Sequence, residues 1–231
     1  MKHLIETANP SGLAITEYDR IILNSSTNDV IVGGGVNANG HPYVDLGLPS
    51  GLKWAKCNVG AEKETDYGDY FMWGSTTPNT ETECTWKNAP FNGGASDYDS
   101  NYFNKVKDTV APNNVLAREY DAAAQIMGGN WRMPTNTEIQ ELIDNTTNEW
   151  TQVNGVNGMK FTASNGNSIF IPASGYRSDS SFYDQGSYAS LWSSSLLSPS
   201  FSNAYYWDLR ANDTEGSDSR CFGYTVRGVC E

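Results

Sequence analysis

The chain has 231 residues, of which 38% are hydrophobic and 12% are aromatic, and its formal net charge is −12. A chain this acidic is repelled by the phosphates of nucleic acid and by anionic lipid head groups, so neither is expected as a partner. No apolar run approaches the ~20 residues that cross a bilayer, so membrane insertion is not expected either.

Residues 1–40 differ in composition from the rest of the chain. Their start lacks the apolar stretch of a secretory signal, so either the protein is made and assembled in the cytoplasm, which Met1 favours, or a signal has been removed. Residues 20–23 and 29–32 are β-branched runs around a polar loop, typical of a hairpin, and 33–35 and 37–40 are typical of a linker. An isolated hairpin is marginal in water. We therefore expect a β-rich arm for assembly or attachment, most simply in a homo-trimer.

The main domain is expected to span residues 43–231. Residues 52–59 alternate between apolar and polar side chains and predict a strand. Residues 70–73 predict a buried strand that ends at a glycine. Residues 75–112 combine Pro, Asn, Gly and Asp with scattered aromatic side chains, which predicts a long surface loop.

Two helices are predicted in the middle of the chain. Residues 115–127 place apolar side chains on one helical face before two consecutive glycines. Residues 134–143 begin with Thr135 and Glu138 at the spacing of a capping box. We expect Thr135 to cap this helix and Arg132 to hold the preceding loop through a carboxylate or carbonyls, because a guanidinium offers five donors in a fixed fork.

Only strands are predicted after the second helix. Asn165 and Gly166 form a hairpin signal between strand candidates at 159–163 and 168–172. The alternation at 223–229 predicts that one of two pairs is buried, either Tyr224 with Val226 or Thr225 with Arg227. Further strand candidates lie at 189–194 and 204–209. The expected fold is α+β, loop-rich, with more strand than helix, and its core is expected to hold Trp54, Trp73, Trp131, Trp192 and Trp207.

Residues 174–227 have the most informative composition. They are rich in Ser, Tyr, Trp, Asn and Asp and contain no lysine. Tyrosine and tryptophan supply a large contact area at low entropic cost, and serine and asparagine supply adaptable hydrogen bonds, as in antibody paratopes. A catalytic site instead needs a few titratable groups held in place, and no such set is evident here. The composition therefore predicts a binding surface.

Three islands in the sequence resemble a known family. They are VDLGLPSG at 44–51 with WAKCNVGA at 54–61, NWRMPT at 130–135 with Glu138, and WSSS at 192–195 followed by NAY at 203–205 and GYTVR at 223–227. In this order they resemble C-type lectin-fold domains of the formylglycine-generating-enzyme variety, which are abundant in gut bacteria and their phages. The resemblance covers roughly residues 43–229. It implies a C-type lectin-like domain with two helices, small antiparallel sheets and long loops.

The C-terminal part resembles the variable proteins of diversity-generating retroelements, in which template adenines are rewritten. The resemblance implies a fixed scaffold that includes Trp192, Asn203, Ala204, Tyr205, Gly223 and Arg227. It also implies a diversified ligand face at about 177–222. Because side chains alternate along a strand, about half of the aromatic side chains in this stretch are expected to face the ligand. The expected face residues are Arg177, Ser178, Asp179, Phe182, Tyr183, Tyr188, Ser190, Leu191, Leu196, Phe201, Tyr206, Asp208, Arg210, Asn212, Ser217, Asp218, Ser219, Cys221 and Phe222.

No catalytic, metal or cofactor site is expected. The formylglycine-generating relatives use a cysteine pair near the C-terminus, but the spacing of Cys221 and Cys230 does not match it, and neither has a histidine nearby. The calcium-binding tripeptides of sugar-binding lectins are missing, and His3 and His41 lie outside any ligand-like cluster. We expect reduced, mostly buried thiols, and the resemblance implies that Cys57 lies near Cys230.

The expected function is non-enzymatic ligand binding, as a phage receptor-binding or adhesion protein on the virion. Its variable face would contact a bacterial surface protein or glycan, and its arm would contact other virion proteins. Two alternatives stay open. One is a structural or decoration protein of the virion, for which the arm matters most. The other is a bacterial adhesin at the cell surface.

Overall fold

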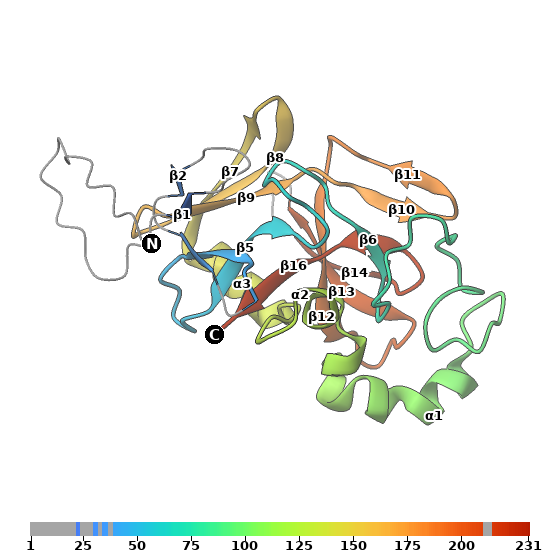
Figure 1. Ribbon diagram of the computed structural model, residues 1–231. Helices are drawn as coiled ribbons and strands as arrows, with labels where there is room; N and C mark the ends of the chain where they lie inside the picture. The colour runs from blue at the N-terminus through green and yellow to red at the C-terminus, as the bar shows by residue number, and fades with distance from the viewer. Residues whose placement is uncertain (1–21, 24–29, 32–33, 37–38, 210–213) are drawn as a thin grey trace, which may run out of the picture.

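The computed structural model describes residues 22–23, 30–31, 34–36, 39–209 and 214–231 (Figure 1). Strands dominate these residues and few helices accompany them, so the chain has an α+β fold. Figure 1 shows two groups of strands at the top of the view, and α1 (Ser100–Val110) projects at the lower right. The two groups are the sheet of β7 (Thr146–Val153), β8 (Val156–Ala163) and β9 (Ser168–Pro172) and the hairpin of β10 (Tyr176–Ser178) and β11 (Ser181–Tyr183). The remaining residues of the expected arm, and Arg210 and Asn212 of the expected face, lie outside the described residues.

The largest sheet carries most of the C-terminal half of the chain. Its strand order is β11–β10–β15–β12–β13–β14, and β6 also pairs with β15. Most neighbours are antiparallel, but β12 and β15 run parallel. The strands are β6 (Tyr70–Met72), β10 (Tyr176–Ser178), β11 (Ser181–Tyr183), β12 (Ala189–Leu196), β13 (Asn203–Leu209), β14 (Thr214–Ser219) and β15 (Gly223–Thr225).

A four-stranded sheet joins the two ends of the main domain. It contains, in spatial order, β16 (Arg227–Cys230), β5 (Lys53–Asn58), β4 (Pro42–Asp45) and β3 (Gly34–Val36). The strand β3 corrects the predicted linker, because Gly34 and Gly35 pair with Val44 and Tyr43. The stretch that was expected to separate the arm from the domain therefore forms the edge of this sheet.

Two smaller sheets complete the strands. The predicted hairpin around Asn165 and Gly166 is confirmed as β8 (Val156–Ala163) and β9 (Ser168–Pro172), with β7 (Thr146–Val153) added at the edge of β8. The predicted N-terminal hairpin is confirmed in its short pairing of β1 (Ile22–Leu23) with β2 (Val30–Ile31).

The helices differ more from the predictions. Helix α1 (Ser100–Val110) lies in the stretch predicted as loop; Asp99 caps it and it buries Phe103 and Val110. The predicted helix at 115–127 is shorter, because Asp121 caps α2 (Ala122–Met127) and the preceding residues include only the 3-10 turn η2 (Arg118–Tyr120). The 3-10 turn η1 (Pro112–Asn114) follows α1. Helix α3 (Asn136–Asp144) confirms the second predicted helix.

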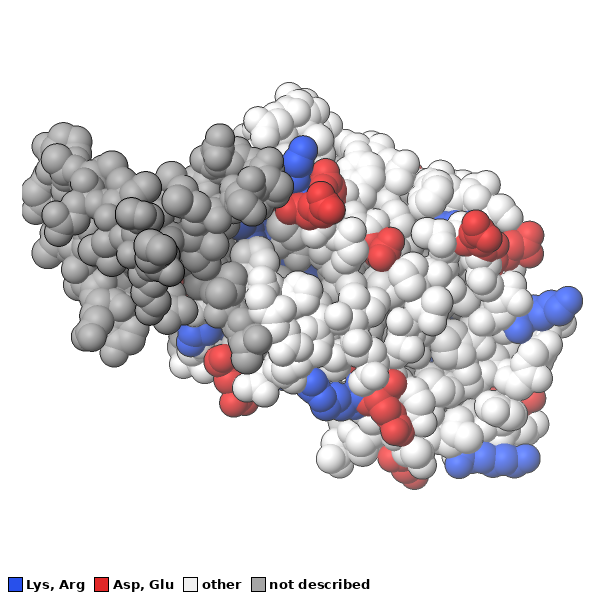
Figure 2. All heavy atoms as spheres, viewed as in Figure 1, with Lys and Arg blue, Asp and Glu red and all other residues white. Residues whose placement is uncertain are grey.

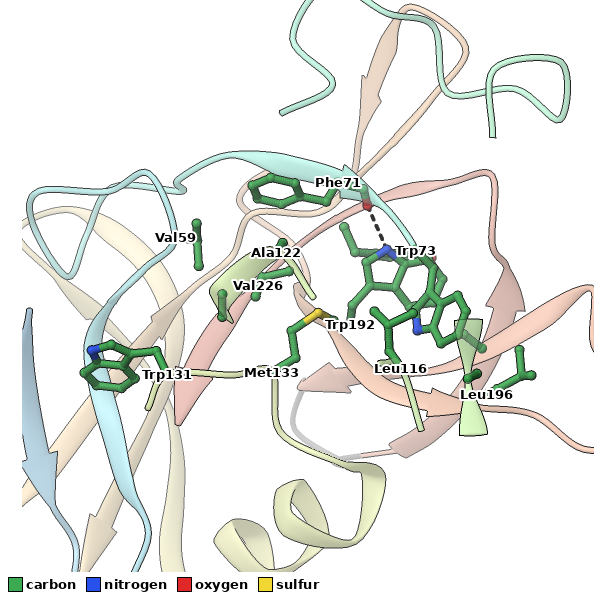
Figure 3. Packing of buried hydrophobic residues seen from close by; sticks show 14 of the residues in the cluster. Val59, Phe71, Trp73, Leu116, Ala122, Trp131, Met133, Trp192, Leu196 and Val226 are labelled. Carbon is green, nitrogen blue, oxygen red and sulfur yellow. Dashed lines mark hydrogen bonds between the residues drawn. The ribbon is translucent and has the colours of Figure 1, made fainter. Parts of the chain in front are cut away.

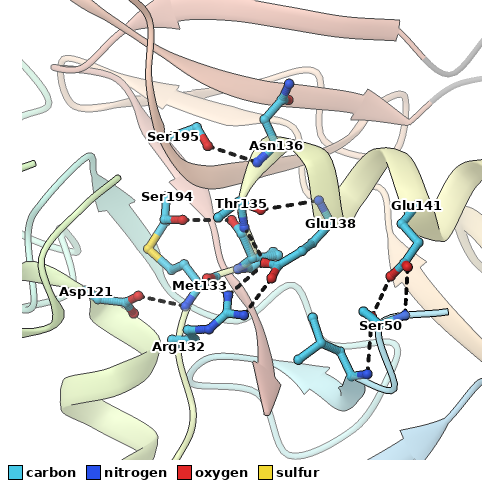
Figure 4. A network of polar contacts seen from close by, with 12 residues as sticks. Ser50, Asp121, Arg132, Met133, Thr135, Asn136, Glu138, Glu141, Ser194 and Ser195 are labelled. Atoms are coloured by element: carbon cyan, nitrogen blue, oxygen red, sulfur yellow. Dashed lines mark hydrogen bonds and ion pairs between the residues drawn. The ribbon is translucent and has the colours of Figure 1, made fainter. Parts of the chain in front are cut away.

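A polar network fixes the start of α3 (Figure 4). Thr135 and Glu138 form both bonds of the predicted capping box. Arg132 donates to both carboxylate oxygens of Glu138, at 2.7 and 2.6 Å, which confirms that this arginine holds the loop. Burial raises the pKa of Glu138, but the hydrogen bonds from Arg132 and Thr135 outweigh it, so the pKa is lowered overall. Buried Asp121 accepts from the Met133 amide at 2.8 Å and thereby ties α2 to the same loop.

Two hydrophobic cores lie on opposite faces of β12 and β13. The first core contains Trp192 of β12 with Trp73 and Trp131, and the second contains Leu191 of β12 with Trp54 and Trp207. All five tryptophans expected in the interior are buried. Figure 3 shows Trp73 and Trp192 next to Leu116 and Leu196, with Trp131 at the other end of the first core. The indole of Trp192 donates to the Phe71 carbonyl at 2.8 Å, so its polar atom is satisfied.

The C-terminal strands are buried on both faces. The prediction of one buried pair is wrong, because Tyr224, Thr225, Val226 and Arg227 are all buried. Arg227 donates to the carbonyls of Ala55, Lys56 and Phe170 and to the side-chain oxygen of Asn58, at 2.6–2.9 Å. Arg227 thus joins β16, β5 and β9 through its hydrogen bonds.

Candidate binding surface

The β10–β11 hairpin forms one edge of the largest sheet and exposes its aromatic side chains. Its tip bends at Asp179, which has a positive φ of 49° and exchanges backbone hydrogen bonds with Cys84 at 2.9 and 3.1 Å. Phe182 and Tyr183 of β11 are 49% and 43% exposed. Because its tip is tied to another loop, the hairpin presents these two rings on a supported edge.

A continuous row of rings crosses the sheet from this hairpin to β13. We call it the aromatic strip; its members are Tyr183, Tyr176, Phe222, Tyr224 and Tyr206. Tyr176 stacks on Tyr183 with ring centroids 5.3 Å apart and lies 5.6 Å from Tyr224 and 5.8 Å from Phe222. Tyr224 in turn stacks on Tyr206 at 4.8 Å. These separations fall in the range in which aromatic pairs attract one another.

Tyr224 is the buried centre of the strip. Its hydroxyl donates to Asp218 Oδ2 at 2.8 Å, and its ring meets Trp192 edge-on at 4.7 Å. Burial, followed by the nearby Asp218 carboxylate, raises the pKa of Tyr224. The hydroxyl therefore stays protonated and keeps Asp218 in place beside the outer rings.

Gly216 makes room for the Tyr206 ring at the far end of the strip. The two residues are paired between β14 and β13. A Cβ at position 216 would lie 2.5 Å from Cε1 of Tyr206, closer than real side chains approach. The absence of a side chain on Gly216 thus allows the Tyr206 ring to lie across β14.

Arg220 anchors the loops that border the strip. The side chain is fully buried, with its guanidinium carbon 3.9 Å from the ring centre of Phe103 and 5.6–5.8 Å from Trp73, Trp86 and Tyr98. Its Nε donates to the Phe201 carbonyl at 2.8 Å. Burial lowers the pKa of Arg220 to about 10, so the group is still charged at neutral pH. Cation–π attraction to this ring cage compensates part of the lost hydration.

Basic and acidic side chains of residues 174–227 differ in how deeply they are buried. Among the described residues of 174–227, the arginines Arg177, Arg220 and Arg227 are buried, whereas Asp179 and Asp184 are exposed and Asp218 is half-buried. Arg177 lies 5.4 Å from the Phe182 ring centre and donates to the Thr82 carbonyl at 3.2 Å. On the face that Figure 2 shows, charged side chains are scattered over a mostly neutral surface.

Part of the predicted face is accessible. The exposed positions are Asp179, Phe182, Tyr183 and Ser217. The half-buried positions are Ser178, Tyr188, Phe201, Tyr206, Asp208, Asp218, Ser219 and Phe222. These residues come from β10, β11, β13, β14 and the adjoining loops, so segments separated in the sequence contribute to the same sheet.

Five predicted face residues are corrected because their side chains are buried: Arg177, Ser190, Leu191, Leu196 and Cys221. The three on β12 are buried because that strand has core on both of its faces. Cys221 packs with Met72 and Cys84 in a small separate cluster.

Sequence reasoning missed Tyr176, Gly216 and Asp184. Tyr176 joins the rings of β11 to those of β15, and its position directly opposite Tyr183 depends on a register that composition does not reveal. The only sequence signal for Gly216 is a glycine within a strand, which indicates that another group approaches the backbone closely there. Asp184 has a positive φ of 57°, typical of a turn position that aspartate tolerates.

The four cysteines are free thiols. Burial raises the pKa of Cys84 to about 11 and that of Cys221 to about 12. Cys57 is half-buried and lines a cavity of about 550 Å³ together with His41 and Met127, away from the aromatic strip. β16 does pair with β5, but Cys230 lies opposite Lys53 and not opposite Cys57.

Within the part of the chain that the structure describes, no group of three or more His, Cys, Asp or Glu side chains is placed to hold a metal ion. No helix of the described residues is both long and apolar enough to cross a membrane. Comparisons with protein-family models, with curated proteins and with solved structures found no match.

Proposed function

We propose that this chain is a non-enzymatic ligand-binding protein: a receptor-binding or adhesion protein of a phage particle. The observation that carries the proposal is the aromatic strip that starts at the edge of the largest sheet, together with the exposed Phe182. Phe182 precedes Tyr183 on β11 and therefore points to the opposite face, where it contacts Tyr70 and Arg177. Tyrosine-rich surfaces on a rigid scaffold suit protein or glycan ligands, because little conformational entropy is lost on binding.

The fold of the proposal is C-type lectin-like. Support comes from the pairing of the terminal strands β5 and β16 and from the capped helix α3. The sequence islands that resemble the lectin-fold family lie at these places. Trp131 and Arg227, which belong to the islands, are fully buried, as scaffold residues of such a domain should be.

A diversified face is the second part of the proposal. Diversification requires positions that change without unfolding the chain, next to positions that do not change. Phe182, Tyr183 and Ser217 are exposed and none of them has a positive φ, and substitutions away from packed or strained positions usually alter stability by only ~0.5 kcal/mol. The neighbouring Trp192 and Gly223 are buried and supply the constant frame.

The absence of enzymatic activity is also part of the proposal. A catalytic cysteine acts as a thiolate, which a lowered pKa favours. Burial raises the pKa of Cys57, Cys84, Cys221 and Cys230 instead, and this supports a binding protein. The proposed partners are a bacterial surface protein or glycan at the C-terminal face and other virion proteins at residues 1–40, with a homo-trimer as the assembly.

The test is binding of the labelled full chain to a panel of gut bacterial cells. A Phe182→Ser, Tyr183→Ser double variant should lose most of the binding, because both rings are largely exposed. Its melting temperature should change little for the same reason. Tyr102→Ser, at an exposed tyrosine of α1, is the matched control and should bind normally.

Unchanged cell binding by the double variant would remove the β11 rings from the proposed site. A second observation bears on diversification alone. A reverse transcriptase gene beside this gene, with a near-copy of its 3′ end altered at adenines, is expected if the face is rewritten.

A further inference from the structure

The exposed part of the aromatic strip lies among carboxylates. Asp184 directly follows Tyr183, and the Asp218 side chain accepts the Tyr224 hydroxyl at 2.8 Å. Burial is the main reason that the pKa of Tyr176 is raised, and Asp184 and Asp218 add to the rise. Tyr176, which contacts both Tyr183 and Tyr224 in the strip, therefore lies in the field of both carboxylates.

Basic side chains near the aromatic strip are buried. In the described part of residues 174–227, each arginine is buried, and the segment contains no lysine or histidine. Arg220 is surrounded by rings and Arg227 by carbonyls. Lys107 lies above the Phe201 ring but forms an ion pair with Asp108. Among the described residues, the side chains around the strip thus supply anions and π-faces, whereas Arg177, Arg220 and Arg227 are buried.

We propose that the aromatic strip binds a cationic side chain, lysine or arginine, on a protein segment of the target. This inference rests on the proposed function and names the chemistry of its ligand. The faces of Tyr176 and Tyr183 attract a cation through the ring quadrupole, and guanidinium also stacks on such rings. Asp184 and Asp218 accept its hydrogen bonds, since each has lone pairs left beyond its bonds within the chain.

A basic protein segment fits this surface better than a neutral glycan. A neutral sugar can stack on a tyrosine but gains nothing from the surrounding negative potential. A basic segment gains from both, and charge complementarity also accelerates its association. An acidic glycan would be repelled by Asp179, Asp184 and Asp218.

The experiment measures the affinity of the full chain for a labelled hexa-arginine peptide by fluorescence anisotropy, with maltohexaose as the neutral-glycan probe. Asp184→Asn removes one carboxylate at nearly constant shape, and asparagine tolerates the positive φ at this position. It should weaken peptide binding about three- to tenfold, as should Tyr183→Leu. Added salt should weaken the wild-type complex as well.

The matched control is Glu149→Gln, which removes one exposed carboxylate from β7, outside the largest sheet. It tests for unspecific attraction of the peptide to a chain of net charge −12. Peptide affinity should stay within twofold of the wild type. Equal weakening by Glu149→Gln and Asp184→Asn would overturn the inference, and so would maltohexaose binding that is tighter than peptide binding and sensitive to Tyr183→Leu.

Failure of this inference is distinguishable from failure of the proposed function. If Asp184→Asn leaves peptide affinity unchanged while the Phe182→Ser, Tyr183→Ser variant still loses cell binding, the surface stands but the cationic ligand is wrong. If the double variant also keeps its cell binding, the surface itself is wrong.

Discussion

Arg220 and Arg227 are buried arginines that are stabilised in different ways. Arg227 donates hydrogen bonds to four oxygen acceptors, whereas Arg220 is enclosed mainly by aromatic rings. Neither forms an ion pair with a carboxylate among the described residues. Burial lowers the pKa of each to about 10, so both remain charged at neutral pH. Stability then depends on keeping every compensating contact, because an uncompensated buried charge is costly.

Arg227→Met should lower the free energy of unfolding by about 3 kcal/mol or more, because four acceptors lose their donor. The free energy of unfolding of Arg227→Lys should lie between those of Arg227→Met and the wild type, since an ammonium group cannot match the planar fork of donors on a guanidinium. Urea unfolding at pH 7 measures both. Arg118→Lys, at an exposed arginine that bonds the carbonyls of Gly129 and Trp131, is the control and should cost less than 1 kcal/mol. Wild-type stability of Arg227→Met would contradict the role assigned to this side chain.

At the scale of elements, α3 depends on its N-terminal cap. Thr135→Ala removes the acceptor for the Glu138 amide and should cost about 1 kcal/mol, or about 2–4 °C in melting temperature for a chain of this size. Thr135→Ser keeps the hydroxyl and should restore most of the loss. Cell binding should be unchanged in both variants, and a selective binding defect without a stability change would show that α3 belongs to the binding surface.

The elements that could be predicted from sequence are those with a strong local signal. The capping box gave α3, the Asn165–Gly166 turn gave β8 and β9, and alternation gave β5. Helix α1 was missed because residues 75–112 were interpreted together from their Pro, Asn, Gly and Asp content, although Phe103, Val106 and Val110 recur at helical spacing and pack on the first core. The short α2 was predicted too long because Leu116 is buried in an extended segment that bonds the Ser194 carbonyl, not in a helix.

The composition of the candidate surface could be read from the sequence, but which of its side chains are buried could not. Serine is common among exposed and buried positions of residues 174–227, and Ser190, Ser193 and Ser194 are buried. Their burial follows from the position of β12 between two cores, which only the order of strands in the sheet determines. Tyr176 and Tyr183 meet through strand register, which is likewise not a local property of the sequence.

For the whole molecule, buried acids predict a loss of stability at alkaline pH. Burial raises the pKa of Cys84 to about 11, of Cys221 to about 12 and of Tyr70 to about 12, above their ordinary values of 9, 9 and 10. Above pH 9 the unfolded chain releases these protons while the folded chain retains them, so the free energy of unfolding falls as pH rises. The lowered pKa values of Arg220 and Arg227 act in the opposite direction, but only above about pH 10.

The urea midpoint should therefore decrease between pH 9 and pH 10. A Cys84→Ala, Cys221→Ala double variant should show a smaller decrease, because the two thiols titrate first in the unfolded state. The difference between pH 7 and pH 8 provides the baseline, where none of these groups titrates appreciably. A midpoint that rises from pH 9 to pH 10 would contradict the assignment of these thiols as buried and protonated.

The placement of β15 and β16 also has a consequence for how errors in the gene are tolerated. β15 lies in the interior of the largest sheet, where it pairs with β6, β10 and β12, and β16 forms the edge of the four-stranded sheet next to β5. A premature stop or frameshift upstream of β15 removes an interior strand from the largest sheet and the edge strand β16 from the four-stranded sheet. If the face before β15 is rewritten by an error-prone process, β15 and β16 can form only when translation continues in frame through the rewritten segment. We therefore expect chains truncated before β15 to be unstable, because they lack the core contacts of Tyr224, Val226 and Val229.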